Sequence, residues 1–128
     1  MRDAEDYLAF VKAQIVVHAR VIHWQVMREE AQEDEGLYRY RLTLENGDLL
    51  EAFERFQVQS GQVQIIKYSF QWQDAHGTSR KRWDNAAHHP ELAAFPHHVH
   101  EGPEERVSPH QPMALEDVLA LLEEAMQP

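Results

Sequence analysis

The feature that most constrains the fold is the dipeptide Asn46-Gly47, which lies between two stretches that each place apolar residues at short intervals. Leu37–Leu44 precedes it with apolar or aromatic residues at alternate positions, and Leu49–Val58 follows it. Both central residues of a type I′ turn need positive φ, which asparagine and glycine tolerate, so this pair predicts a tight β-hairpin. The apolar residues of Leu49–Val58 also fit a helical spacing, but the turn favours a returning strand.

Two more glycine turns extend the hairpin into a meander. Ser60-Gly61 and His76-Gly77 flank Val63–Gln73, in which aromatic and polar residues alternate, and Thr78–Asp84 returns after the second turn. With His76-Gly77 at the loop tip, the predicted cross-strand pairs are Phe70 with Trp83, Trp72 with Lys81, Gln71 with Arg82, and Gln73 with Arg80. This hairpin therefore has an aromatic face for the core and a Gln/Arg face for something polar.

The ends of the chain read as helices. Apolar residues recur at helical spacing in 3–14 and in Met113–Met126. Between the first helix and the hairpin, 16–28 is rich in β-branched residues and predicts a strand, and the acidic run 29–35 predicts a solvated loop. The segment 85–112 contains five prolines and predicts an irregular, histidine-rich loop.

The predicted fold class is therefore α+β, with an N-terminal helix, a meander of about five antiparallel strands, a His-rich loop and a C-terminal helix. A chain of 128 residues is expected to form a single domain, residues 1–128.

Composition narrows the classes of function. The chain has no cysteine, so disulfides, thiolate nucleophiles and Cys-ligated zinc are excluded. No apolar run approaches the roughly 20 residues that span a bilayer, and the acidic N-terminus does not resemble a signal peptide, so a cytoplasmic protein with no membrane partner is expected. The net charge of −10 disfavours generic nucleic-acid binding. Between Lys67 and His100, however, four Lys/Arg residues outnumber three Asp/Glu residues.

The chemistry-bearing residues concentrate in Arg80–His100, and they allow three interpretations. His98 and His100 share one face if their segment is extended, and His88 or His89 with Asp84 would complete the ligand count of a catalytic zinc site. Their spacing matches no helical zinc motif, however, and we predict no resident metal or other cofactor.

Acid–base catalysis is the second interpretation, because histidine titrates near neutral pH and arginine stabilises developing negative charge. The third is structural: Trp83 belongs to the core, Asp84-Asn85 starts a turn, and the histidines are ordinary loop residues.

The same stretch resembles the signature of the TumE-like toxins of prokaryotic toxin–antitoxin pairs. The residues that carry the resemblance are Tyr38-Arg39-Tyr40-Arg41-Leu42, Tyr68-Ser69-Phe70-Gln71-Trp72-Gln73, Arg82-Trp83-Asp84-Asn85-Ala86, His88-His89-Pro90-Glu91-Leu92, Phe95-Pro96-His97-His98-Val99-His100 and Leu115-Glu116-Asp117-Val118-Leu119. The resemblance covers about residues 37–122. The chain departs from it at Ala87, where a proline is expected, and at Gln71, where an aromatic residue or a histidine is frequent.

This resemblance implies a toxin restrained by a helix-turn-helix antitoxin protein and acting on RNA or translation. The leading hypothesis is a metal-independent ribonuclease. Its predicted catalytic residues are His88, His89, His98, His100 and Asp84, and its predicted substrate-binding residues are Arg80, Arg82 and Asn85. One alternative is a non-enzymatic protein whose His-rich loop docks a partner or a metal, and another is a metal-dependent hydrolase. The oligomeric state is left open, with a homodimer among the states considered.

Overall fold

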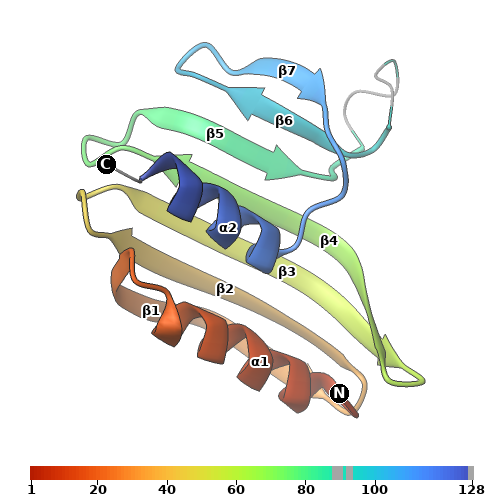
Figure 1. The fold of residues 1–128 in the computed structure, drawn as a ribbon. Helices are drawn as coiled ribbons and strands as arrows, with labels where there is room; N and C mark the ends of the chain where they lie inside the picture. Colours follow the sequence, from red (N-terminus) through yellow and green to blue (C-terminus); the bar gives the residue numbers. More distant parts are fainter. Residues whose placement is uncertain (88–90, 92–93, 127–128) are drawn as a thin grey trace.

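The computed structural model describes residues 1–87, 91 and 94–126, and it places two helices on one face of a seven-stranded sheet (Figure 1). In chain order the elements are α1 (Ala4–Val17), β1 (Val21–Gln32), β2 (Glu35–Leu44), β3 (Leu49–Gln59), β4 (Gln62–Gln73), β5 (Ser79–Asp84), β6 (His98–Glu101), β7 (Arg106–Pro109) and α2 (Leu115–Ala125).

The sheet is a simple meander, since each strand pairs antiparallel with the next in the order β1 to β7. This confirms the α+β class, the terminal helices and the antiparallel meander. The hairpin is confirmed, but its turn is not type I′, because Gly47 has φ +90° whereas Asn46 is not among the residues with positive φ. The N–H of Gly47 donates to the carbonyl of Leu44 and the N–H of Leu44 to the carbonyl of Asp48, which makes a three-residue loop.

Several boundaries differ from the sequence-based prediction. Helix α1 continues to Val17, so the first strand begins later than predicted and ends at Gln32. The acidic run 29–35 is mostly strand and turn rather than a loop, because β1 and β2 pair as far as Gln32 and Glu35. The predicted irregular segment 85–112 contains β6 and β7, which pair with β5 and with each other.

Alternate residues of the strands face the helices and form the core. The buried strand positions are mainly large and apolar: Tyr38, Tyr40, Leu42, Leu44, Leu50, Ala52, Phe56, Val58, Tyr68, Phe70, Trp83 and Val99. Helix α1 contributes Leu8, Val11 and Ile15, and α2 contributes Val118 and Leu122. The other sheet face lies opposite the helices, and we call it the open face.

A buried carboxyl group ties this core together. Glu54 on β3 is fully buried, and the hydroxyls of Tyr7 and Tyr38 each donate a hydrogen bond of 2.7 Å to its Oε1. Burial raises the pKa of Glu54 to about 7, although the two tyrosine hydrogen bonds favour its charged form. The tyrosine donors therefore connect α1, β2 and β3 at one point.

The register of the β4–β5 hairpin determines which face of the sheet each predicted site residue of β5 occupies. Phe70 pairs with Trp83 and Gln71 with Arg82, as predicted. The predicted pairing of Gln73 with Arg80 is wrong, because a bulge places Ser79 opposite Gln73 instead.

Neither helix in the described part of the chain has the length and hydropathy that a membrane crossing requires.

Candidate functional site

The candidate site forms where β5 and β6 pair on the open face. The register places His98 opposite Asp84 and His100 opposite Arg82. Cross-strand neighbours project from the same face of a sheet, so the four side chains gather over two adjacent strands. A single apolar residue, Val99, anchors β6 to the core between the two histidines.

Asp84 is the centre of this cluster. Its Oδ1 lies 2.9 Å from Nε2 of His98 and accepts a hydrogen bond of 3.0 Å from the backbone N–H of Ala86. Its Oδ2 accepts a 3.1 Å hydrogen bond from Nε of Arg82 and lies 3.5 Å from Nε2 of His100. One largely buried carboxylate thus orients Arg82 and faces His98, and Arg82 in turn contacts His100.

The hydrogen bonds assign different roles to the two imidazoles. Nδ1 of His98 lies 2.8 Å from the carbonyl oxygen of Pro96, which only accepts, so this nitrogen carries a proton. A proton or another cation on Nε2 of His98 is then needed for an attractive contact with Asp84. Nε2 of His100 lies 3.1 Å from Nη2 of Arg82, which only donates, so this imidazole nitrogen offers its lone pair.

Electrostatics keep His100 ready to accept a proton. Burial lowers the pKa of His100, and the positive charge of Arg82 lowers it further, while Asp84 acts in the opposite direction. A neutral imidazole near pH 7 is the form that a general base needs.

The same cluster has the donor set of a metal site. The ligand atoms of Asp84, His98 and His100 all lie within 4.8 Å of one another. Two histidines and a carboxylate suit zinc or iron. The guanidinium of Arg82, however, already contacts the carboxylate and His100, so a metal held by all three would have to take over these contacts.

The structure brings together only part of the predicted site. Arg82, Asp84, His98 and His100 converge, whereas Arg80 pairs with the buried Asp48 at 2.9 Å. His88 and His89 lie outside the described residues.

The side chains of Asn85 and His97 contact residues of β4 and do not join the cluster around Asp84. The side chain of Asn85 accepts from the backbone N–H of Tyr68 and donates to the carbonyl of Ile66, which extends the ladder of β4. The hydroxyl of Tyr68 in turn lies 2.9 Å from Nδ1 of His97. The structure thus favours a structural role for Asn85 over substrate binding.

One member of the cluster was not predicted from the sequence. Glu105, in the turn between β6 and β7, lies 3.5 Å from Nη1 of Arg82. Gly102 and Glu105 both have positive φ in this turn, and Gly102 is the one sequence signal for it within the predicted irregular segment 85–112.

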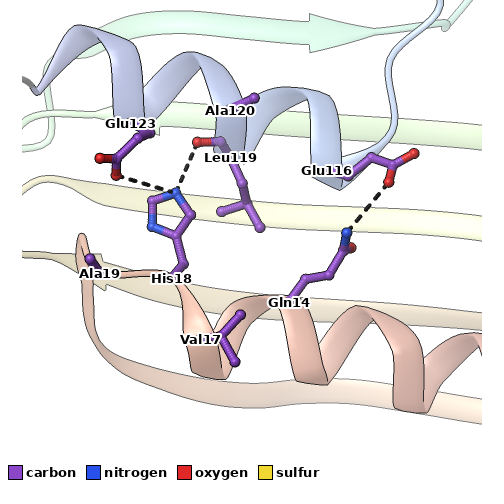
Figure 2. A pocket seen from close by; sticks show the side chains of 8 residues that line it. All are labelled: Gln14, Val17, His18, Ala19, Glu116, Leu119, Ala120 and Glu123. Atoms are coloured by element: carbon purple, nitrogen blue, oxygen red, sulfur yellow. Dashed lines mark hydrogen bonds and ion pairs between the residues drawn. The ribbon is translucent and has the colours of Figure 1, made fainter.

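A hollow of about 480 Å³, separate from this cluster, lies between the end of α1 and α2 (Figure 2). There, Nε2 of His18 lies 2.9 Å from the carbonyl oxygen of Leu119 and 4.0 Å from Glu123, and Gln14 contacts Glu116. These contacts join the two helices through His18, which caps α1 rather than lying in a strand as predicted.

Comparison with known proteins places the chain in a family. A family model described as "Toxin TumE" matches residues 9–126, nearly the whole chain. A search of curated proteins found no match. A search of solved structures also found none.

Proposed function

The chain belongs to the TumE toxin family, and from this we propose that it is the toxin of a toxin–antitoxin pair and acts as a metal-independent ribonuclease. The observation that carries the ribonuclease proposal is the contact between His100 and Arg82, with the guanidinium of Arg82 oriented by Asp84. It provides a base and a phosphate-binding cation side by side, which are two of the three groups that RNA cleavage needs.

The proposed reaction is attack of a ribose 2′-oxygen on the adjacent phosphate. Arg82 transfers its hydrogen bond from His100 to the phosphate, which frees Nε2 of His100 to take the 2′-hydroxyl proton. The O2′–P bond forms and the P–O5′ bond breaks, leaving a 2′,3′-cyclic phosphate and a 5′-hydroxyl. The leaving oxygen takes its proton from a second histidine, and His98, His88 and His89 are the candidates. Asp84 is a positioning residue in this scheme.

The partner of the toxin is proposed to be a helix-turn-helix antitoxin protein. The net charge of −10 favours a partner that presents basic residues. A gene for such a protein adjacent to this one, and rescue of growth by its co-expression, are the expected findings.

A second candidate function rests on burial. His98 is 2% exposed, and its two nitrogens face Pro96 and Asp84, which is the environment of a structural histidine. In this reading the cluster fastens β6 to β5, and the toxin blocks its target by binding without cleavage.

Induced expression in a bacterial host tests the toxin and separates the two candidates. We expect wild-type protein to arrest growth and His100→Ala to abolish the arrest. Urea unfolding of the purified variant at the growth temperature should show that it is folded in the absence of urea. His76→Ala removes an exposed turn histidine and is the matched control, expected to arrest growth like wild type. If the wild-type protein leaves growth unaffected, the proposal that the chain is a toxin is contradicted. Full arrest by folded His100→Ala supports blocking without cleavage.

A further inference from the structure

The open face of the sheet carries a continuous row of side chains, polar except for Phe53, that ends at the candidate site. Each member lies directly opposite the next on the neighbouring strand: Arg28, Arg39, Phe53, Ser69, Asp84 and His98. Neighbouring strands are about 4.8 Å apart, so Phe53 on β3 lies roughly 10 Å from Asp84 on β5. One extended ligand on this face would therefore span the distance from Phe53 to the site, where the side chain of Arg82 is more exposed than that of Asp84.

Two positively charged residues, Arg55 and Lys67, lie next to this row, and their pairing does not stabilise the fold. Arg55 on β3 lies directly opposite Lys67 on β4, and both are exposed. Like charges in direct cross-strand pairs are unfavourable. In the part of the chain that the structure describes, neither residue forms an ion pair that would offset this. Such a pair is suited to an anion from outside the chain.

Arg55 and Lys67 line a hollow of about 750 Å³ together with Phe53, Ile66 and Arg28, which we call the β2–β4 hollow. The guanidinium of Arg39 lies 4.8 Å from the centre of the Phe53 ring. Aromatic rings and guanidinium planes are the surfaces on which unstacked nucleobases stack. The hollow thus combines a phosphate-binding pair with a base-stacking ring.

The acids of the hollow are mostly neutralised by their own partners. Glu29 pairs with Lys12, and Glu30 with Arg28. Glu35 remains at the end of the hollow, opposite the neutral Gln57. Arg55 and Lys67 therefore keep an excess of positive charge.

We propose that the β2–β4 hollow binds single-stranded RNA, with Arg55 and Lys67 holding a backbone phosphate and Phe53 stacking on a base. The strand then crosses the open face along the row from Phe53 to Asp84 and reaches His100 and Arg82. This inference rests on the proposed function, because it takes RNA as the substrate and places the uncut part of the same strand.

Fluorescence anisotropy with 2′-O-methyl decauridylate tests the hollow without cleavage, since this RNA has no free 2′-hydroxyl. Arg55→Gln with Lys67→Gln is expected to weaken binding about tenfold, if each lost phosphate contact costs about 0.7 kcal/mol. The slope of log affinity against log salt should fall by about 0.7, the value for one neutralised phosphate in single strands.

Arg2→Gln with Arg106→Gln removes the same charge away from the open face and is the matched control, expected to bind like wild type. A double variant that binds with the control's affinity and salt slope overturns the inference, as does wild-type protein that does not bind this RNA. If the double variant loses binding as expected but the wild-type protein does not cleave unmodified RNA, the RNA-binding role of the hollow is supported and only the ribonuclease proposal is contradicted. If the double variant binds normally and still cleaves RNA, only the RNA-binding role of the hollow is contradicted.

Discussion

At the scale of single residues, Asp84 has both a structural and a chemical role. It caps the turn after β5 through the backbone of Ala86 and also orients Arg82, which in turn contacts His100. The sequence indicated both roles for Asp84 without choosing between them, and the geometry supports them together. A carboxylate with two oxygens can accept from a turn and from a guanidinium at the same time.

Arg82→Gln tests the electrostatic coupling at the site. Arg82 is the second cause, after burial, of the lowered pKa of His100, so its removal should raise that pKa. We expect an NMR titration of the His100 ring to move to higher pH in the variant. The low-pH limb of RNA cleavage should move in the same direction, because a base with a raised pKa stays protonated to higher pH.

Lys81→Gln is the control for this titration. Lys81 is the next residue along β5, but it pairs with Glu101 on the helix-covered face. It should leave the His100 titration in place. A pKa of His100 that is unchanged or lower in Arg82→Gln would contradict the assigned contact.

At the scale of secondary-structure elements, the Glu54 cluster should make the packing of α1 on the sheet depend on pH. The pKa of Glu54 is raised to about 7 by burial, above the value of 4.5 for an exposed glutamate. The folded state therefore holds a proton that the unfolded chain releases between about pH 4.5 and 7. Stability from this group is fully present below pH 4.5 and is lost as pH rises through 7, by about 3 kcal/mol in total.

Glu54→Gln should remove this dependence, since the amide oxygen still accepts from Tyr7 and Tyr38 but does not titrate. Urea unfolding at pH 4.5, 6 and 8 measures the difference. Glu51→Gln, on the open face of the same strand, is the control and should keep the wild-type trend. Parallel pH curves for wild type and Glu54→Gln would show that Glu54 does not carry the effect.

The elements found from the sequence were those with strong local signals. Asn46-Gly47 and the alternation of Tyr38, Tyr40 and Leu42 specified a hairpin and its buried face. Strand β6 was missed because only Val99 among its four residues is apolar, and β7 ends in Pro109. The strand conformation of β6 depends on pairing with β5, and that of β7 on pairing with β6, which no local pattern reveals.

The sequence predicted the site only in part, because the direction of each side chain depends on the register of its strand. The register of the β4–β5 hairpin placed Arg82 on the polar face correctly, because Trp83 beside it must face the core. One bulged residue was enough to misplace Arg80, since side chains alternate faces with every residue. Nothing in the sequence distinguishes a regular strand from one with a bulge at this point.

At the scale of the whole molecule, charge is divided between the two faces. The helices carry six acidic residues and one lysine: Glu5, Asp6, Glu116, Asp117, Glu123, Glu124 and Lys12. The open-face strand positions carry six cations against four acids: Arg28, Arg39, Arg41, Arg55, Lys67 and Arg82, against Glu30, Glu35, Glu51 and Asp84. The net charge of −10 therefore does not describe the surface beside the site, where RNA is proposed to bind.

The most direct measurement is cleavage of a defined RNA by the purified protein in excess EDTA, with the product ends identified by mass spectrometry. We expect cleavage that persists without divalent metal and leaves 2′,3′-cyclic phosphate and 5′-hydroxyl ends. His100→Ala should slow it by at least about a hundredfold, the usual contribution of a general base. Cleavage that requires an added metal, or equal cleavage by wild type and His100→Ala, would contradict the central claim.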